Sequence, residues 1–399
     1  MAPRPQQQPA SGAPYRYMQG VSVPATSVRP KEFFARTRRH TVTEASRAWN
    51  GLGGQDVFEL KKADILDRLF LRISGSVTST PGTGTVATTR RWPYDLARQI
   101  RFTANGASNL INANGALLVA REFTASPDRD DRGVQQSIGG ATVNQGTLSK
   151  SCESWGVGSG ATAIGAGTYP FDIIIPIPVA ENGIDLAGAI YCASSSTDLT
   201  LMVDWESAAN MFTLTGNGAV SMTATVQLTS QRYSIPMGAD GQIVVPDLSV
   251  FHSIVKTSTG ALSNGANETR LVGQGAGKTL LRVLFRTMNG APATAVPLAF
   301  NSTNYGEQGI RFSANETPDD YFDGQTLHWI NERAYNTDLG TYWGYGVHDF
   351  AAENAFRDAI DMGTTSELRL LTTIQSAVSL VTPSFEYAQE TIFAAGTGS

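Results

Sequence analysis

The stretch LVGQGAGKTLLRVLF (271–285) decides between two folds, because it fits either a nucleotide-binding loop or the start of a β-strand. A phosphate-binding loop of the form G-x-x-x-x-G-K-[ST] needs four residues between its glycines and must open a helix. Counted back from Gly277, the first glycine of that motif is replaced by valine. The residues that follow alternate with the period of a strand, which we therefore predict here. Leu281, Val283 and Phe285 fall on one face, and Arg282 and Arg286 fall on the other.

The composition of the whole chain also favours strands. A chain of 399 residues is too long for one small core, so two domains are expected. Only 16% of the residues are charged, 40 are glycine, and long helical heptads are missing. This profile predicts an all-β protein, with sandwiches or barrels whose strands are joined by many turns.

Several segments alternate between apolar and polar residues, as strands with one buried face do. They are LFLRI (69–73), LTLMVDW (199–205) and VSMTATVQL (220–228). A further strand is expected in YPFDIIIPIPV (169–179), where two prolines stand two residues apart. Their missing N–H groups point the same way, which predicts an edge or corner strand.

Three segments have helical spacing instead. They are SNLINANGALLVAREF (108–123), GQTLHWINERAYNTDL (324–339) and DFAAENAFRDAIDM (349–362). Asp349 is placed to cap the last of them. Helices of this length are expected only as connections between strands.

The predicted domain division follows a break rich in proline and glycine near residues 232–252. We expect an extended basic arm at 1–50, a first β-domain at 51–238, a second at 239–390 and a short tail at 391–399. Long Gly-, Ser- and Asn-rich connections separate the strands within each domain.

The N-terminal arm differs from the rest of the chain in charge. Residues 1–50 carry eight basic and two acidic side chains, a net +6, which leaves −11 on the remainder of a chain whose total is −5. A basic arm on an acidic body predicts an anionic partner: nucleic acid, lipid headgroups or an acidic neighbour. A short amphipathic segment on a headgroup surface, a clip onto a neighbouring subunit and a solvated tail all fit residues 31–49. The predicted contact residues are Arg29, Lys31, Phe33, Phe34, Arg36, Arg38, Arg39 and Arg47.

No stretch carries a recognisable catalytic, cofactor or metal site, and we predict none. SPDRDDRG (126–133) has the opening acids of a calcium loop but lacks its later ligands. GVGSG (156–160) misplaces the serine of a nucleophile elbow. His328 and Glu332 share a helical face without a third ligand, so an ordinary surface contact is expected.

The cysteines and the hydropathy pattern bound the location of the chain. Cys152 and Cys192 are predicted to be partly buried free thiols, because two cysteines do not make a disulfide framework. The sequence shows neither a secretory signal nor a stretch of about 18 apolar residues. We expect synthesis in the cytoplasm and contact with any membrane only at its surface.

A series of landmarks follows in order along residues 55–399. They are FELKKADILDRLFLRISGSV (58–77), WPYDLARQIRFTANG (92–106), NGIDLAGAIYCASSSTDLTLMVDWES (182–207), SQRYSIPMGADGQIVVPDLSVF (230–251), TLHWINERAYNTDL (326–339) and ETIFAAGTGS (390–399). In this order they resemble the double jelly-roll major capsid proteins of tailless, membrane-containing icosahedral bacteriophages, the tectivirus type. The arm at 1–50 matches that family poorly, because it is rich in proline and arginine.

The resemblance implies two consecutive eight-stranded jelly rolls with a few short helices in their connections. It implies a structural subunit of an icosahedral viral capsid, without catalytic activity or cofactor. The subunit would form a homotrimer, a pseudo-hexagonal capsomer that tiles with neighbouring capsomers over an internal membrane. The basic arm would face inward, toward the viral membrane surface. Minor capsid and vertex proteins would be further partners, without sequence-specific nucleic-acid binding, in a virion whose proteins are made in the host cytoplasm.

Two other functions stay open from the sequence. A β-rich viral spike or receptor-binding adhesin would show fibrous repeats or an aromatic carbohydrate platform. The only aromatic-dense stretch is TYWGYGVHDF (341–350), which we interpret as a strand with Tyr342 and Trp343 at a subunit contact. A glycan-acting jelly-roll enzyme is the third possibility, because its carboxylates would not form a linear motif.

Overall fold

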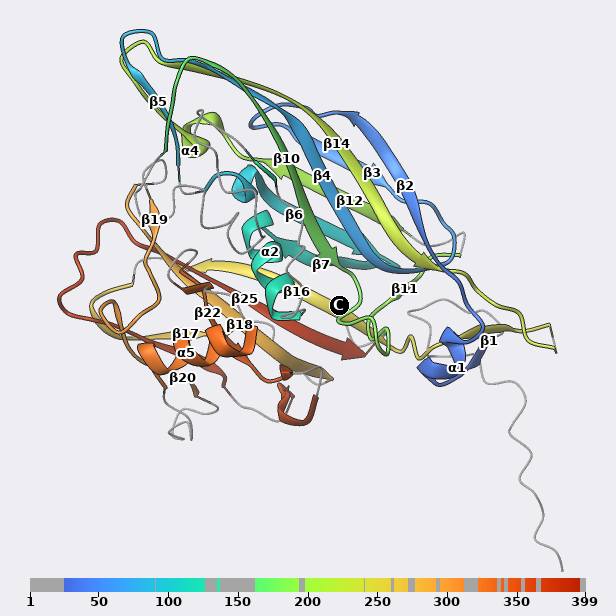
Figure 1. The fold of residues 1–399 in the computed structure, drawn as a ribbon. Helices are drawn as coiled ribbons and strands as arrows, with labels where there is room; N and C mark the ends of the chain where they lie inside the picture. Colours follow the sequence, from blue (N-terminus) through green and yellow to red (C-terminus); the bar gives the residue numbers. More distant parts are fainter. Residues whose placement is uncertain are drawn as a thin grey trace, which may run out of the picture.

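The computed structural model shows a chain built mainly of strands, with a few short helices between them (Figure 1). It describes residues 25–89, 91–125, 135–136, 162–193, 198–239, 241–259, 262–271, 277–291, 295–311, 322–335, 339–340, 344–352, 356–363 and 367–394. The chain length predicted two domains, and the strands gather in two successive sandwiches.

The first sandwich consists of two four-stranded sheets around one hydrophobic core. One sheet has the order β2 (Arg39–Ala48), β14 (Ala219–Tyr233), β4 (Ile65–Thr80) and β10 (Gly167–Pro178). The other has the order β3 (Gln55–Glu59), β12 (Leu199–Trp205), β6 (Ala97–Ala104) and β7 (Ala107–Ala113). Two short strands, β8 (Gln135–Gln136) and β11 (Ile190–Tyr191), pair with β10 and β4.

The second sandwich repeats this plan with a separate core. Its inner sheet has the order β16 (Val250–Thr259), β25 (Ser384–Ala394), β18 (Lys278–Asn289) and β19 (Val296–Pro297), and β22 (Gly346–Asp349) and β23 (Ile360–Asp361) also pair with β18. Its outer sheet has the order β17 (Gly265–Arg270), β24 (Arg369–Ile374), β20 (Tyr305–Arg311) and β21 (Phe322–Asp323). Each half therefore has two main sheets of four strands, and short additional strands pair with them.

One sheet runs through both sandwiches. Strand β7 of the first half pairs in parallel with β16 of the second, with Ile111 opposite Ile254 and Asn112 opposite Val255. This contact merges two sheets into one of ten strands. The two halves are thus joined by backbone hydrogen bonds as well as by side chains.

The alternation in the sequence explains which face of each strand is buried. Leu69, Leu71 and Ile73 of β4 are fully buried, while the residues between them are more exposed. Strand β18 begins at Lys278, which confirms the strand predicted from LVGQGAGKTLLRVLF. Residues 272–276, where the phosphate loop would lie, are outside the described residues.

Smaller elements cover the ends of the sandwiches. Strands β5 (Thr85–Thr88), β13 (Phe212–Thr215) and β9 (Thr162–Ile164) form a three-stranded sheet, and β1 (Ala25–Ser27) pairs with β15 (Ile243–Val245). The helical elements are α1 (Pro30–Phe34), α2 (Gly115–Ala125), α4 (Ala208–Met211), α5 (Gly324–Tyr335), and the 3-10 turns η1 (Tyr94–Leu96) and η3 (Phe356–Asp358). Helix α2 lies between the two sandwiches, whereas α5 lies on the second (Figure 1).

The three helix predictions had different outcomes. The helix predicted at 324–339 is present as α5. The one at 108–123 was wrong in its first half, because pairing with β6 and β16 makes residues 107–113 a strand before α2 begins. The one at 349–362 was wrong in the described residues, which hold only the turn η3 and strand β23. Asp349 ends β22, and its carboxylate contacts Arg282 and not a helix N-terminus.

The prolines of β10 have the surroundings expected of an edge. Strand β10 pairs with β4 along its whole length, but with β8 only at Phe171 and Asp172. Pro176 and Pro178 lie beyond that short pairing, where β4 is the one strand partner within the described part of the chain. Their missing donors therefore break no ladder there.

The two ends of the chain enter the sheets further than the predicted boundaries allow. Residues 39–48, expected within the arm, form β2 and pair with β14. Residues 391–394, expected in the tail, belong to β25 and pair with β16. In both places, pairing with a neighbouring strand makes the segment part of a sheet. The boundary near residue 238 stays a prediction, and the flanking strands β14 and β16 belong to different sandwiches.

Candidate functional site

The N-terminal segment is anchored by a small hydrophobic cluster at one end of the first sandwich. Phe33 of α1 is fully buried there, and its ring contacts the rings of Phe34 and Tyr233. Val245 of β15 and Leu248 belong to the same cluster. The prediction that Phe33 contacts a membrane or an inner partner was wrong, because its ring is fully buried and offers no such contact.

Five of the predicted basic residues are exposed near α1 and the start of β2. They are Arg29, Lys31, Arg36, Arg38 and Arg39. Arg36 pairs with Glu32 one helical turn away at 2.8 Å, and Arg39 donates to the side chain of Gln231. An exposed pair of this kind contributes little to stability, so these cations remain available at the surface.

Arg47 lies apart from this group. Eight residues separate it from Arg39 along β2, or about 26 Å at 3.3 Å per residue. Its guanidinium lies 3.1 Å from Asp56, donates to the carbonyl of Val57 at 2.7 Å and lies over the ring of Phe58. The structure therefore does not bring Arg47 together with the other predicted contact residues.

A cluster of charged residues, here called the seam network, lies where the two sandwiches meet. Its members are Arg121, Glu181, His252, Arg282, Asp349 and Glu390. Arg121 of α2 and Glu181 come from the first half, and the others come from β16, β18, β22 and β25 of the second. Five of them are at most 1% exposed, and the sixth, Asp349, has a side chain that is 8% exposed. The network thus ties the two sandwiches together through buried charges.

Glu390 is the centre of the seam network. Its Oε1 accepts from Arg121 Nη2 at 2.5 Å and from His252 Nε2 at 2.9 Å, and Arg282 Nη1 lies 3.1 Å away. Burial alone would raise the pKa of Glu390, because it penalises the charged form. Arg121, Arg282 and the His252 hydrogen bond outweigh that effect and hold the pKa of Glu390 well below its usual range.

Arg282 extends the network toward the second sandwich. It donates to Glu181 Oε1 at 2.9 Å, and its Nε lies 3.0 Å from Asp349 Oδ1. Asp349 Oδ2 in turn accepts from the hydroxyl of Tyr335 on α5 at 2.9 Å. Burial, together with the charge of Asp349, raises the pKa of Tyr335 well above its usual value, so the hydroxyl stays a donor.

The hydrogen bonds of His252 assign its protonation. Its Nε2 faces the Glu390 carboxylate at 2.9 Å, and its Nδ1 faces the carbonyl oxygen of Val179 at 3.2 Å. Both partners are acceptors without a hydrogen, so both ring nitrogens must donate, which fits the imidazolium form. With that charge, three cations balance the three carboxylates of the network.

A second buried ion cluster crosses the same boundary. Arg286 of β18 lies 3.3 Å from Asp95 of the first sandwich and donates to Glu386 of β25 at 2.9 Å. Lys256 lies 2.9 Å from the same Glu386. Burial would raise the pKa of Glu386, but Arg286 and Lys256 lower it to about 2. The carboxylate therefore stays charged at neutral pH.

Sequence reasoning missed both clusters. It placed Arg282 and Arg286 correctly on one face of a strand, but a polar face normally contacts solvent. Here the face is covered by the other sandwich, and Arg282 is only 1% exposed. The available signal was the presence of two arginines on one face of the strand. Arginines are almost never buried without partners, so if this face is buried, carboxylates are expected beside it.

The other predicted sites have plain outcomes. His328 and Glu332 form the expected i, i+4 contact on α5, at 3.9 Å. Cys192 is a buried free thiol, and burial raises its pKa to about 12. The segments 126–133 and 156–160, Cys152, Tyr342 and Trp343 lie outside the described residues. Across the described ranges, no group of three potential metal ligands gathers, and no helix is long and apolar enough to cross a membrane.

Comparisons with known proteins agree on the architecture. No family model and no curated protein matches the chain. The MCP of STIV, the Sulfolobus Turreted Icosahedral Virus, aligns with a TM-score of 0.62 over 90% of this chain and 97% of that one, at 14% identity. The chain has the double jelly-roll fold.

Two further structures show the same jelly-roll pair. VP54 of PBCV-1 aligns with a TM-score of 0.56 over 91% of this chain and 96% of its own, at 9% identity. The major capsid protein P2 of bacteriophage PM2 aligns with a TM-score of 0.50 over 90% and 98%, at 12% identity. The two sandwiches are therefore the first and second jelly rolls, and the seam network lies between them.

Proposed function

We propose that this chain is the structural subunit of an icosahedral viral shell, a major capsid protein located in the virion. The observation that carries the proposal is the pair of eight-stranded jelly rolls that share one sheet. Solved proteins with this architecture over nine tenths of the chain include the P2 major capsid protein of a bacteriophage and the STIV MCP. A structural and not a catalytic role follows from the same proposal.

The assembly unit in this proposal is a homotrimer. Three copies of two similar jelly rolls place six sandwiches around one axis, which gives a pseudo-hexagonal capsomer that tiles with its neighbours. The buried seam network supports this arrangement, because it fixes the two jelly rolls of one subunit as a single block. Minor capsid and vertex proteins would fill the positions that a regular capsomer cannot occupy.

The exposed basic residues near α1 are assigned to the inner side of the shell. Arg29, Lys31 and Arg38 would face the anionic surface of an internal membrane, together with Arg36 and Arg39. Each cation near such a surface contributes about 1 kcal/mol, and the contribution fades within a Debye length. Such a patch binds charge and not base sequence, so sequence-specific nucleic-acid binding is not part of the proposal.

Removing three of these charges should weaken vesicle binding. We expect the triple variant Arg29→Gln, Lys31→Gln, Arg38→Gln to bind anionic phosphatidylglycerol vesicles about 100-fold less tightly, from about 1 kcal/mol per charge. Vesicle co-sedimentation at low and high salt measures the change. The matched control replaces the exposed Arg72, Arg98 and Arg333 by glutamine, and its binding should stay near that of the native chain. Equal loss in both variants would reduce the effect to net charge.

The solution mass tests the capsomer itself. We expect light scattering to give about three times the chain mass of 42.5 kDa, unchanged on dilution. Obligate interfaces bury large apolar areas, so the trimer should not dissociate at low concentration. Truncation of residues 1–24, which leaves β1, α1 and β2 intact, should preserve the trimer if the arm serves the membrane. A stable monomer would count against the shell subunit and favour an adhesin or an enzyme.

A further inference from the structure

Three arginines stand in one row across the outer sheet of the second jelly roll. Arg270 of β17 is directly opposite Arg369 of β24, and Arg369 is directly opposite Arg311 of β20. Residues in register on neighbouring strands point to the same face. This face is the outer one, because the alternate residues Thr269, Leu370 and Ile310 are buried in the core of the jelly roll.

The three arginines form what we call the arginine row, and it is a costly arrangement for an isolated sheet. Like charges directly opposite each other destabilise neighbouring strands. Glu268 offsets part of this repulsion, since its Oε2 accepts from Arg311 at 2.8 Å and from Arg369 at 2.5 Å. Glu367 accepts from the other nitrogen of Arg369 at 2.6 Å. Two carboxylates thus face three guanidinium groups.

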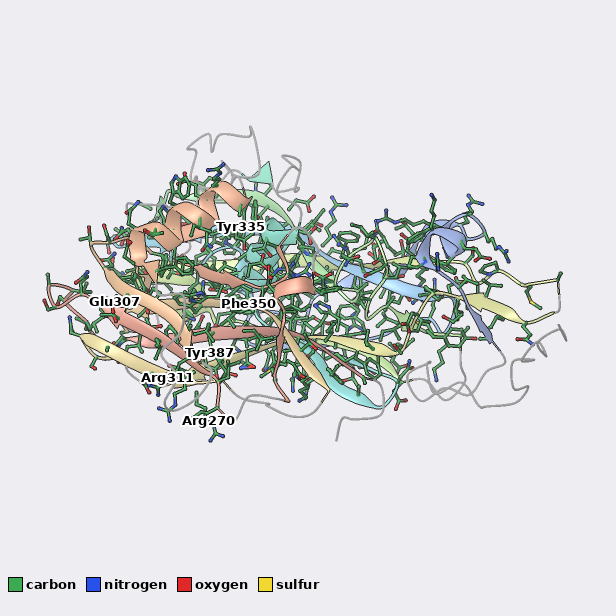
Figure 2. All side chains as sticks on the ribbon, turned by 90° about the horizontal axis from the view of Figure 1, so that it is seen from below. Arg270, Glu307, Arg311, Tyr335, Phe350 and Tyr387 are labelled. Carbon is green, nitrogen blue, oxygen red and sulfur yellow. The ribbon has the colours of Figure 1, made fainter. Side chains whose placement is uncertain are left out.

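Arg270 is the cation left over. Among the described residues no carboxylate lies within ion-pairing distance of it, and it is exposed. Figure 2 shows Arg270 and Arg311 close together on the outside of the second jelly roll. All three arginines also lower the pKa of Glu367, first through the hydrogen bond from Arg369 and then through their charges.

Hydrogen bonds fix the backbone that carries this cation. The hydroxyl of Tyr387 donates to the carbonyl oxygen of Arg270 at 3.2 Å, and the next residue, Leu271, donates its N–H to Leu368 at 2.9 Å. The end of β17 is therefore tied to both β24 and β25. The planar guanidinium is pre-organised to pair with a carboxylate through two hydrogen bonds, so it loses less entropy for each hydrogen bond formed.

We propose that the arginine row is a docking surface for a carboxylate-bearing surface of a neighbouring copy of this chain. The inference rests on the proposed shell function, because a subunit of a shell contacts neighbouring copies of itself. The chain outside residues 1–50 carries a net charge of −11, so a neighbouring copy offers an acidic partner. Charge complementarity of this kind sets the orientation and register of an interface.

Reversal of the unpaired charge tests the proposal without weakening the subunit. Arg270→Glu places a carboxylate opposite Arg369, so the variant should fold with native or greater stability. We expect it to keep the trimer mass but to associate trimer with trimer at least tenfold more weakly, because like charges then meet in the contact. Sedimentation velocity over a concentration and salt series measures both. Arg98→Glu, the same change at an exposed arginine of β6 in the first jelly roll, is the control and should associate as the native chain does.

Each other outcome overturns the inference. If the Arg270→Glu trimer associates as strongly as the native one, or if native trimers do not associate at the highest soluble concentration, the row is not a contact between copies. If self-association is retained while binding to phosphatidylglycerol vesicles is lost, the row serves a membrane instead. A native chain without a trimer would contradict the proposed function itself, which separates the two failures.

Discussion

Replacing Glu390 by glutamine is expected to lower the free energy of unfolding by about 3–5 kcal/mol, the loss typical when one partner of a buried ion network is removed. Glu390 Oε1 contacts Arg121, His252 and Arg282 within 3.1 Å, and each of these residues is at most 1% exposed. An amide cannot supply the missing negative charge. The variant therefore leaves three buried cations facing two carboxylates at the seam between the jelly rolls.

The exposed pair of Arg72 and Asp172 provides the matched control. Asp172→Asn removes the same charge from a short contact on the outer face of the first jelly roll, where the side chains are 49% and 41% exposed. An exposed pair of this kind contributes about 0–1 kcal/mol. Urea unfolding of both variants, followed by far-UV circular dichroism, measures the difference. Equal losses would show that the seam network does not hold the jelly rolls together.

The second large effect is a loss of stability in mild acid, caused by His348. Burial beside Phe285 lowers the pKa of His348 to about 4 from an ordinary value near 6.5. At a pH between these two pKa values, His348 binds a proton in the unfolded chain but not in the folded chain. The free energy of unfolding should therefore fall as the pH drops from about 7 to about 4, by about 3 kcal/mol.

Glu386 continues the decline at lower pH. Its pKa is lowered from 4.5 to about 2, so the stability that it contributes is present above about 4.5 and is lost as the pH falls toward 2. His348→Phe, which keeps an aromatic ring against Phe285, should remove the step between pH 7 and 4 and leave the lower one. Unfolding curves at each pH unit would show this. Superimposable pH profiles of the variant and the native chain would contradict the assignment to His348.

The strands were predictable because their physics is local. A period of two in 69–73, 199–205 and 220–228 reports directly which face each strand buries, and all three segments are strands. The prolines of β10 also had a local signature, since a missing donor excludes them from a fully paired position. The two-domain plan followed from length and from the proline- and glycine-rich break between the halves.

The failures occurred where partners distant in sequence decide the outcome. Residues 107–113 have helical spacing, yet pairing with β6 and β16 makes them a strand. Residues 39–48 look like a basic arm, but β14 offers them an open edge. Phe33 was predicted as a membrane contact, but Tyr233, Val245 and Leu248 bury it in a hydrophobic cluster.

The seam network and the arginine row could not be predicted for the same reason. The polar face of β18 is buried because the first jelly roll lies against it, and one sequence does not show which faces meet. Arg270, Arg311 and Arg369 are separated by dozens of residues, and only the strand register makes them neighbours. Charge patterning along a chain reveals such rows only after the sheet order is known.

Electron cryomicroscopy of the purified, full-length protein tests the central claim most directly. The proposed shell subunit predicts particles in which six jelly rolls surround a threefold axis, with the outline of a pseudo-hexagon and the α1 ends of the three subunits on one side. Isolated pairs of jelly rolls, or an elongated fibre with repeats along its axis, would contradict it.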